Sequence, residues 1–271
     1  MIQKIFALVP DSLPPGMLYA EAGSTYLAVW QINPSDGAIL AFEWFRWNLT
    51  VENADENILS VKTDSQLLSG QPIHLLLRVE ETVLVPERYA LERLDRDYVC
   101  LQFGSELNSV TYITASVREE MKVISRIPTC LTNSFQQHLV LASMNPAWAR
   151  VLSYTELSTN KANVVFVFFY PESFTLLLYK NGQLHLITDK GFDSPETVLY
   201  CILNLLNQHD LSPFTTEVKI GGMIEAEAPV FKTLYQYLSC LEINEPSAKV
   251  DESLFSGISV HMLLPFADYP L

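Results

Sequence analysis

The side chains that most often carry catalysis are few and scattered in this sequence. Its five histidines are isolated from one another and from any candidate nucleophile: His74, His138, His185, His209 and His261. Catalysis by a serine or cysteine nucleophile needs a base within hydrogen-bonding reach, and the Gly-x-Ser-x-Gly turn that presents such a serine is absent. His74 and His185 lie in predicted strands, where we expect hydrogen-bonded structural histidines. The sequence therefore predicts no catalytic residue.

Metal and phosphate chemistry has no motif in the sequence either. The four cysteines form no Cys-x-x-Cys pair, so we expect them to be reduced and predict neither a zinc site nor a disulfide framework: Cys100, Cys130, Cys201 and Cys240. The P-loop, the EF-hand loop and the dinucleotide-binding Gly-x-Gly-x-x-Gly are absent. A two-metal nuclease needs a carboxylate in its first strand, and the predicted strands 25–32 and 164–170 contain none. No metal site is predicted.

The charge of the chain argues against two classes of partner. With 31 acidic and 17 basic residues the formal net charge is −14. An acidic surface repels nucleic acid and anionic lipid, so we expect neither as a partner. The apolar run at residues 5–9 is too short for the core of a signal peptide, and no stretch approaches the ~18 apolar residues of a membrane span. We therefore expect a cytoplasmic protein.

The elements that must position any site are clearest in the second half. Apolar runs separated by turn residues predict strands at residues 164–170, 174–179 and 183–188. Asp193-Ser194-Pro195-Glu196 is typical of a helix start. A strand at 215–220 then ends in Gly221-Gly222, and a last helix spans 229–241.

The first half has similar patterns and a less regular middle. The clear elements are strands at 25–32, 38–47 and 72–79 and a helix at 55–68. The aromatic side chains of strand 38–47, which include Trp44 and Trp47, favour core packing, with a binding surface as the alternative. The less regular elements are helices at 87–94 and 129–142 and strands at 110–115, 122–127 and 147–154, with a further strand at 258–264 near the end of the chain.

The two halves repeat one order of elements. Strand 27–32, a Pro-Ser-Asp turn and residues 38–40 match strand 165–170, a Pro-Glu-Ser turn and residues 175–177, and each half continues to a helix and an apolar strand. We therefore predict an α/β fold of some α+β character made of two ribonuclease H-like halves. The first half is residues 1–160, with an inserted subdomain around 83–127, and the second is residues 161–271.

This duplicated layout resembles the actin-like ATPase superfamily, which includes sugar kinases, Hsp70-type chaperones and the pilus-assembly ATPase PilM. Residues 218–223, Val-Lys-Ile-Gly-Gly-Met, are similar to the superfamily's adenosine motif, where glycines let the backbone approach a flat base. The resemblance implies a central cleft between the halves, with Gly221 and Gly222 beside any adenine. The layout also resembles a family of uncharacterised bacterial proteins of this fold without an assigned activity.

The phosphate-binding turns of the superfamily are not matched. They carry an Asp and glycines between strands one and two of each half, whereas residues 169–174 here contain Pro171 and neither of these residue types. Residues 31–37 offer only Asp36-Gly37, which also suits an ordinary hairpin turn. We therefore expect a pseudo-ATPase without a cofactor, a binding or scaffold protein whose partner is another protein. The alternative is a diverged ATP-binding or kinase-like protein using ATP and magnesium, with adenine near Gly221-Gly222 and a contribution from Asp36.

Overall fold

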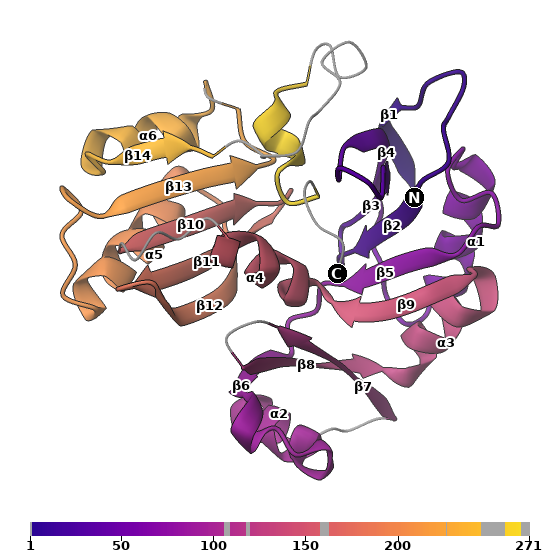
Figure 1. Ribbon diagram of the computed structural model, residues 1–271, viewed down its shortest axis with the longest axis horizontal. Coiled ribbons are helices and arrows are strands. Elements are labelled where there is room, and N and C mark those ends of the chain that lie inside the picture. Colours follow the sequence, from indigo (N-terminus) through magenta and orange to yellow (C-terminus); the bar gives the residue numbers. More distant parts are fainter. Residues whose placement is uncertain are drawn as a thin grey trace. The chain divides into compact units, whose positions relative to one another are not determined.

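Each half of the chain folds around its own β-sheet. The computed structural model describes residues 2–105, 109–117, 120–157, 163–225, 227–244 and 258–266. They form two compact units, the first of residues 2–154 and the second of residues 155–244 and 258–266 (Figure 1).

The sheet of the first unit has six strands in the order β1-β4-β3-β2-β5-β9. The strands are β1 (Gln3–Leu8), β2 (Met17–Ala22), β3 (Tyr26–Ile32), β4 (Ile39–Arg46), β5 (Ile73–Leu77) and β9 (Leu141–Pro146). The pairs β1–β4, β4–β3 and β3–β2 are antiparallel, whereas β2–β5 and β5–β9 are parallel. A parallel step needs a long crossover, and helices supply part of each connection.

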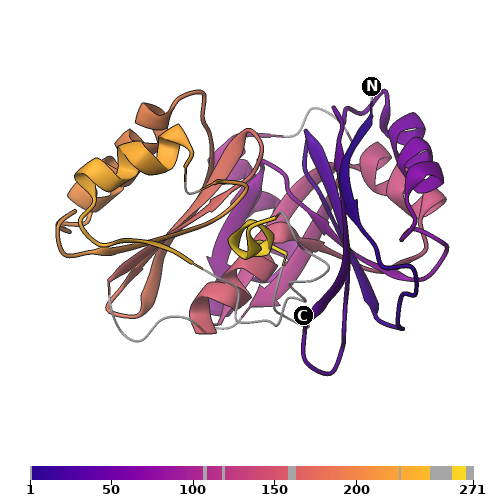
Figure 2. The same cartoon turned by 90° about the horizontal axis from the view of Figure 1, so that it is seen from above.

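Helices α1 (Ala54–Asp64) and α3 (Thr129–His138) cover one face of this sheet (Figure 2). Their apolar side chains, such as Ile58 and Phe135, are buried in one core cluster with the alternate residues of the strands. The other face is rich in rings: Trp44 stacks on Tyr26, and the guanidinium of Arg150 from α4 (Ala147–Leu157) lies 4.5 Å from the centre of the Trp30 ring. Because Trp44 is only 2% exposed and Trp47 only 3%, the aromatic strand is core and not a surface.

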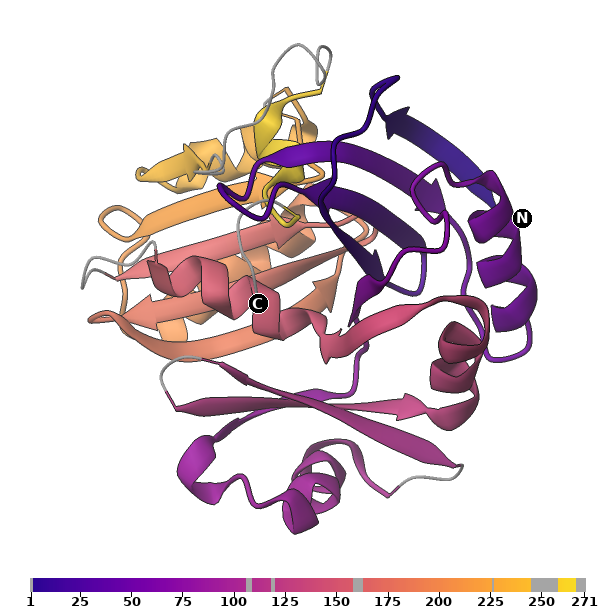
Figure 3. The same ribbon diagram turned by 45° about the vertical axis from the view of Figure 1, so that its right-hand side comes forward.

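A small α/β subdomain is inserted between β5 and α3. It has a three-stranded antiparallel sheet, with α2 packed against it (Figure 3). Its elements are β6 (Thr82–Pro86), the 3-10 turns η1 (Glu87–Tyr89) and η2 (Glu92–Leu94), α2 (Asp95–Phe103), β7 (Val110–Val117) and β8 (Met121–Pro128). Arg126 ties these pieces together, since its guanidinium donates to both carboxylate oxygens of Glu81 and to the carbonyl of Gly104. The Glu81 carboxylate raises the pKa of Arg126.

The sheet of the second unit has five strands in the order β12-β11-β10-β13-β14. The elements are β10 (Val164–Phe169), β11 (Ser173–Lys180), β12 (Gln183–Gly191), α5 (Pro195–Gln208), β13 (Glu217–Gly222), α6 (Pro229–Tyr237), β14 (Leu241–Ile243) and the 3-10 helix η3 (Val260–Leu263). Both α-helices pack against one face of the sheet (Figure 2). The predicted start of α5 is confirmed, because the Ser194 hydroxyl accepts from the amide of Thr197 and Pro195 follows the cap.

The predicted duplication is present, but the predicted match between the halves was one strand out of step. By sheet order β2 corresponds to β10 and β3 to β11, whereas the prediction matched β3 to β10 and β4 to β11. Residues 27–32 therefore lie in the second strand of the repeated unit, which begins with β2, and not in its first strand. The pattern hid β2 because Glu21 interrupts its apolar run, and this buried acid is paired with a residue far along the chain.

Three predicted elements of secondary structure were of the wrong type, and some predicted helices were too long. Residues 147–154 start α4 instead of forming a strand, as the helix-forming Ala147 and Ala149 allow. The helix predicted at 129–142 ends at His138, and β9 follows it. Residues 87–94 form two 3-10 turns instead of one helix, with Leu91 extended before the second turn. Residues 258–264 contain η3, because their apolar side chains are buried by packing on β13 and not by strand pairing.

Candidate functional site

The parallel strands β10 and β13 end side by side, and this is where the superfamily resemblance places adenine. Residues 168 and 169 of β10 are paired with Gly221 and Gly222. In open α/β sheets ligands bind beyond the carboxyl ends of such strands. A ligand site in this unit is therefore expected at the end of β13.

Gly222 is required by the backbone itself. Its φ is +91°, and a Cβ at this position would lie 2.3 Å from the carbonyl oxygen of Phe169. The next amide, that of Met223, donates to the same oxygen at 2.9 Å. Gly222 thus allows two strand ends to meet closely, which explains the glycine without any ligand.

Gly221 lies under another part of the chain. Residues 258–266, called here the closing segment, pack on the end of β13, where the yellow η3 is drawn in Figure 1. A Cβ on Gly221 would lie 2.3 Å from Cδ2 of Leu264. Leu264 is only 2% exposed. The space that a base would take against this glycine is filled by a leucine.

Two further contacts hold the closing segment. His261 Nε2 lies 2.5 Å from the carbonyl oxygen of Ile224, just beyond the two glycines. The ring of Phe266 meets that of Tyr170 edge-on, with centroids 6.5 Å apart, at the end of β10. His261, Phe266 and Tyr170 are all buried. The segment is thus fixed to both strand ends.

The turn between β10 and β11 has little capacity to hold a phosphate. Pro171 has no amide hydrogen, and the amide of Tyr170 donates to the carbonyl of Ser173 at 2.8 Å. Two of the backbone groups that could face an anion are therefore missing or already used.

Asp36 lies in the first unit, in the turn between β3 and β4. Its Oδ1 accepts from the amide of Ala38 at 3.1 Å, and Gly37 has a φ of +73°, as in an ordinary hairpin turn. This turn and the one between β2 and β3 lie at opposite ends of β3. Of the three predicted binding residues, the structure brings Gly221 and Gly222 together and places Asp36 in the other unit.

The residues that the sequence interpretation missed are in the turn between β2 and β3, the true first hairpin of that half. Glu21-Ala22-Gly23-Ser24 places an acid two residues before a glycine. Gly23 is needed because a Cβ there would lie 2.6 Å from the ring of Tyr26. An acid followed by Gly-Ser at the end of a short strand was the signal that could have found this turn.

Glu21 is completely buried and already has protein partners. Its Oε1 accepts from the Tyr26 hydroxyl at 2.5 Å and from Nε of Arg78 at 3.0 Å. The other oxygen, Oε2, is buried and accepts no hydrogen bond from the described residues. The positive charge of Arg78 compensates the carboxylate, which leaves less negative charge for a cation than a free acid offers.

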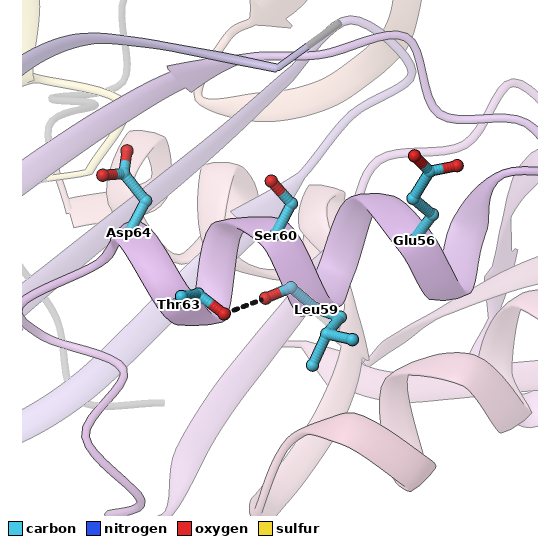
Figure 4. A pocket seen from close by; sticks show the side chains of 5 residues that line it. All are labelled: Glu56, Leu59, Ser60, Thr63 and Asp64. Carbon is cyan, nitrogen blue, oxygen red and sulfur yellow. Dashed lines mark hydrogen bonds between the residues drawn. The ribbon is translucent and has the colours of Figure 1, made fainter.

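The outer side of α1 carries a shallow depression without the chemistry of a site. It is lined by Glu56, Leu59, Ser60, Thr63 and Asp64, all from this one helix (Figure 4). The one hydrogen bond drawn there runs from the Thr63 hydroxyl to the carbonyl of Leu59 inside the helix. Across the residues that the structure describes, no three His, Cys, Asp or Glu side chains gather as metal ligands. No helix in the described ranges is long and apolar enough to cross a membrane.

Comparison of the sequence with known families identifies the family of this chain. The model of the family described as "Protein of unknown function (DUF3822)" matches residues 17–241. The chain belongs to this family. No curated protein matches it in sequence.

Solved structures establish the fold of this DUF3822 chain. A Bacteroides thetaiotaomicron VPI-5482 protein with an actin-like ATPase fold and unknown function is 12% identical, with a TM-score of 0.72 over 89% of this chain and 95% of that one. PilM in the PilM-PilN type IV pilus biogenesis complex is 13% identical, with a TM-score of 0.61 over 93% and 95%. The ethanolamine utilization protein EutJ from Carboxydothermus hydrogenoformans is 9% identical, with a TM-score of 0.52 over 95% and 89%.

These likenesses confirm the predicted actin-like ATPase fold and the resemblance to uncharacterised proteins of that fold. At such low identities they show the fold alone.

Proposed function

We propose that this chain is a non-catalytic actin-like protein that acts in the cytoplasm by binding another protein, as an adaptor or scaffold. The observation that carries the proposal is Leu264, which fills the space against Gly221 where the resemblance places adenine. The turn at Pro171 and the Glu21–Arg78 pair support it, because hydrolysis of ATP needs a magnesium-phosphate clamp that these groups do not provide.

A second candidate is a diverged ATP-binding or kinase-like protein, and one observation favours it. Glu21 stands before Gly23-Ser24 in the first hairpin, and its Oε2 is a buried acceptor without a partner among the described residues. A carboxylate oxygen in this position suits Mg²⁺. Against it, Arg78 already supplies the positive charge, and Leu264 still covers Gly221.

Titration of the full chain with ATP and Mg²⁺ separates the two. We expect no saturable heat and no shift in unfolding temperature. A ligand at 100 times its Kd adds about 2.7 kcal/mol to stability, so 1 mM ATP would reveal a Kd of about 10 µM. Micromolar binding with turnover would overturn the scaffold proposal in favour of the second candidate.

A separate experiment tests the proposed binding of a partner protein. Affinity capture should recover one protein in stoichiometric amount, and titration of that purified protein should reproduce the complex without added nucleotide. A complex that forms only when ATP is present would contradict a nucleotide-independent scaffold.

A further inference from the structure

The closing segment, residues 258–266, contacts β13 like a bound peptide. Three hydrogen bonds within it set its shape: the amides of residues 262, 264 and 266 donate to the carbonyls of residues 259, 261 and 263. Its side chains make the contacts to the strand ends already described. A compact backbone with outward-reaching side chains is the arrangement of a short helical peptide in a groove.

Its three contacts differ in chemistry, which makes them selective. Leu264 fits against a glycine that has no side chain, His261 reaches a backbone carbonyl, and Phe266 meets a tyrosine ring edge-on. Together they form the pattern His-x-x-Leu-x-Phe. A methyl group on Gly221 would overlap the leucine, so the site is shaped for a branched aliphatic side chain at this position.

The main core of the second unit is built without this segment. The core cluster under α5 and α6 consists of strand and helix residues, including Val218, Ile220 and Leu234, and contains no residue of the closing segment. Gly221 and Tyr170 alternate with core residues along β13 and β10, so they face away from that cluster. The segment therefore covers the second face of the sheet, and the principal core does not depend on its side chains.

We propose that the carboxyl ends of β10 and β13 form a peptide-binding site and that the closing segment is its resident ligand, held in cis. The ligand class is a short apolar peptide with the pattern His-x-x-Leu-x-Phe, and a partner protein that carries this pattern displaces the segment. The proposal rests on the proposed function, since it names the class of partner that a nucleotide-free actin-like protein recognises.

In the test, the folded full chain is cut between the core of the second unit and the closing segment, and the exchange of the closing segment for an added peptide is measured. A protease site inserted within residues 245–257 is cleaved after purification, and a fluorescent peptide of residues 258–266 is added while its anisotropy is measured. We expect saturable one-to-one binding that unlabelled peptide reverses. The uncut chain should bind on the order of 100-fold more weakly when the peptide Kd is about 10 µM, because a tethered competitor acts at about 1 mM.

Two variant peptides test the specificity of the proposed site. Leu264→Asp should abolish binding, since it places a charge against buried apolar surface. Met262→Ala, at a position that is only half-buried, should leave binding within a factor of about three of the wild type.

Three outcomes overturn the proposal: the cut chain stays folded by circular dichroism and takes up no peptide, it binds the Leu264→Asp peptide equally well, or it unfolds once cut. The last would make the segment an integral part of the fold. None of these three outcomes involves a nucleotide. Saturable ATP binding to the uncut chain would contradict the proposed function but would leave the result of the peptide-exchange experiment unaffected.

Discussion

At the scale of single residues, the buried ion pair of Glu21 determines the chemistry of the turn between β2 and β3. Glu21 lies at the end of β2 and is fully buried against Arg78 and Tyr26. A buried carboxylate of this kind is held by its charge partner. The pair therefore converts a possible ligand position into a structural one.

Glu21→Gln should lower the stability of the first unit by about 1.5–3 kcal/mol, because the buried Tyr26 hydroxyl and Nε of Arg78 lose a charged acceptor. All four tryptophans belong to this unit, so urea unfolding followed by tryptophan fluorescence reports on it directly. The matched control is Asp64→Asn in the same unit, because the Asp64 carboxylate is exposed, lies 3.8 Å from Nζ of Lys4, and its loss should cost under about 1 kcal/mol. Equal effects of the two variants would contradict a structural role for Glu21.

His74 gives the first unit a dependence on pH. It stacks on Tyr19 and bonds to the Ser143 hydroxyl, and burial lowers its pKa below the ordinary value. The unfolded chain therefore takes up a proton near pH 6.5 before the folded chain does, and stability falls as the pH falls below about 6.5. In His74→Asn we expect a smaller loss of stability between pH 7.5 and 5.5 than in the wild type. Equal losses of stability in the variant and the wild type would contradict this role of His74.

At the scale of elements, the contact between β13 and the closing segment has the clearest consequence. Gly221 and Gly222 are neighbours in one strand, and each excludes a side chain for a different reason. Gly221 faces the side chain of Leu264, whereas Gly222 faces the backbone of Phe169 with a positive φ. A side chain can be shortened by mutation, and a backbone cannot.

Gly221→Ala should destabilise the second unit by about 1–3 kcal/mol through overlap with Leu264. Adding Leu264→Ala should relieve part of that cost, so the double variant is more stable than the sum of the single effects by at least about 0.5 kcal/mol. Gly222→Ala should be equally costly, with no relief from Leu264→Ala. Urea unfolding followed by far-ultraviolet circular dichroism measures the three single variants and the two double variants. Simple additivity at Gly221 would show that Leu264 does not lie against it.

At the scale of the whole molecule, the net charge of −14 sets which partners can approach. A polyanion gains affinity by releasing counterions to basic side chains, and an acidic chain offers little of this. We expect no binding of a labelled 20-base-pair DNA below about 100 µM chain at 150 mM salt, measured by anisotropy. Binding that weakens steeply with added salt would reveal a basic surface and contradict this expectation.

Local patterns were sufficient for much of the fold. The apolar runs and turn residues of the second half predicted β10, β11, β12 and β13, and Ser194-Pro195 predicted the start of α5. These signals are local, because side-chain period and capping chemistry act within a few residues. The same local signals failed for β2 and for residues 258–264, whose acid and apolar side chains find their partners far away in the sequence.

The amino-acid sequence by itself determined that the chain has two α/β halves and that it lacks a recognisable catalytic motif, since these follow from short-range periodicity and residue type. Only the tertiary structure decided which strand comes first in each half, that Arg78 neutralises Glu21, and that Leu264 covers Gly221. The physical reason is the same for all three. Strand pairing, ion pairing and packing join residues that are tens of positions apart, and no local pattern specifies such partners.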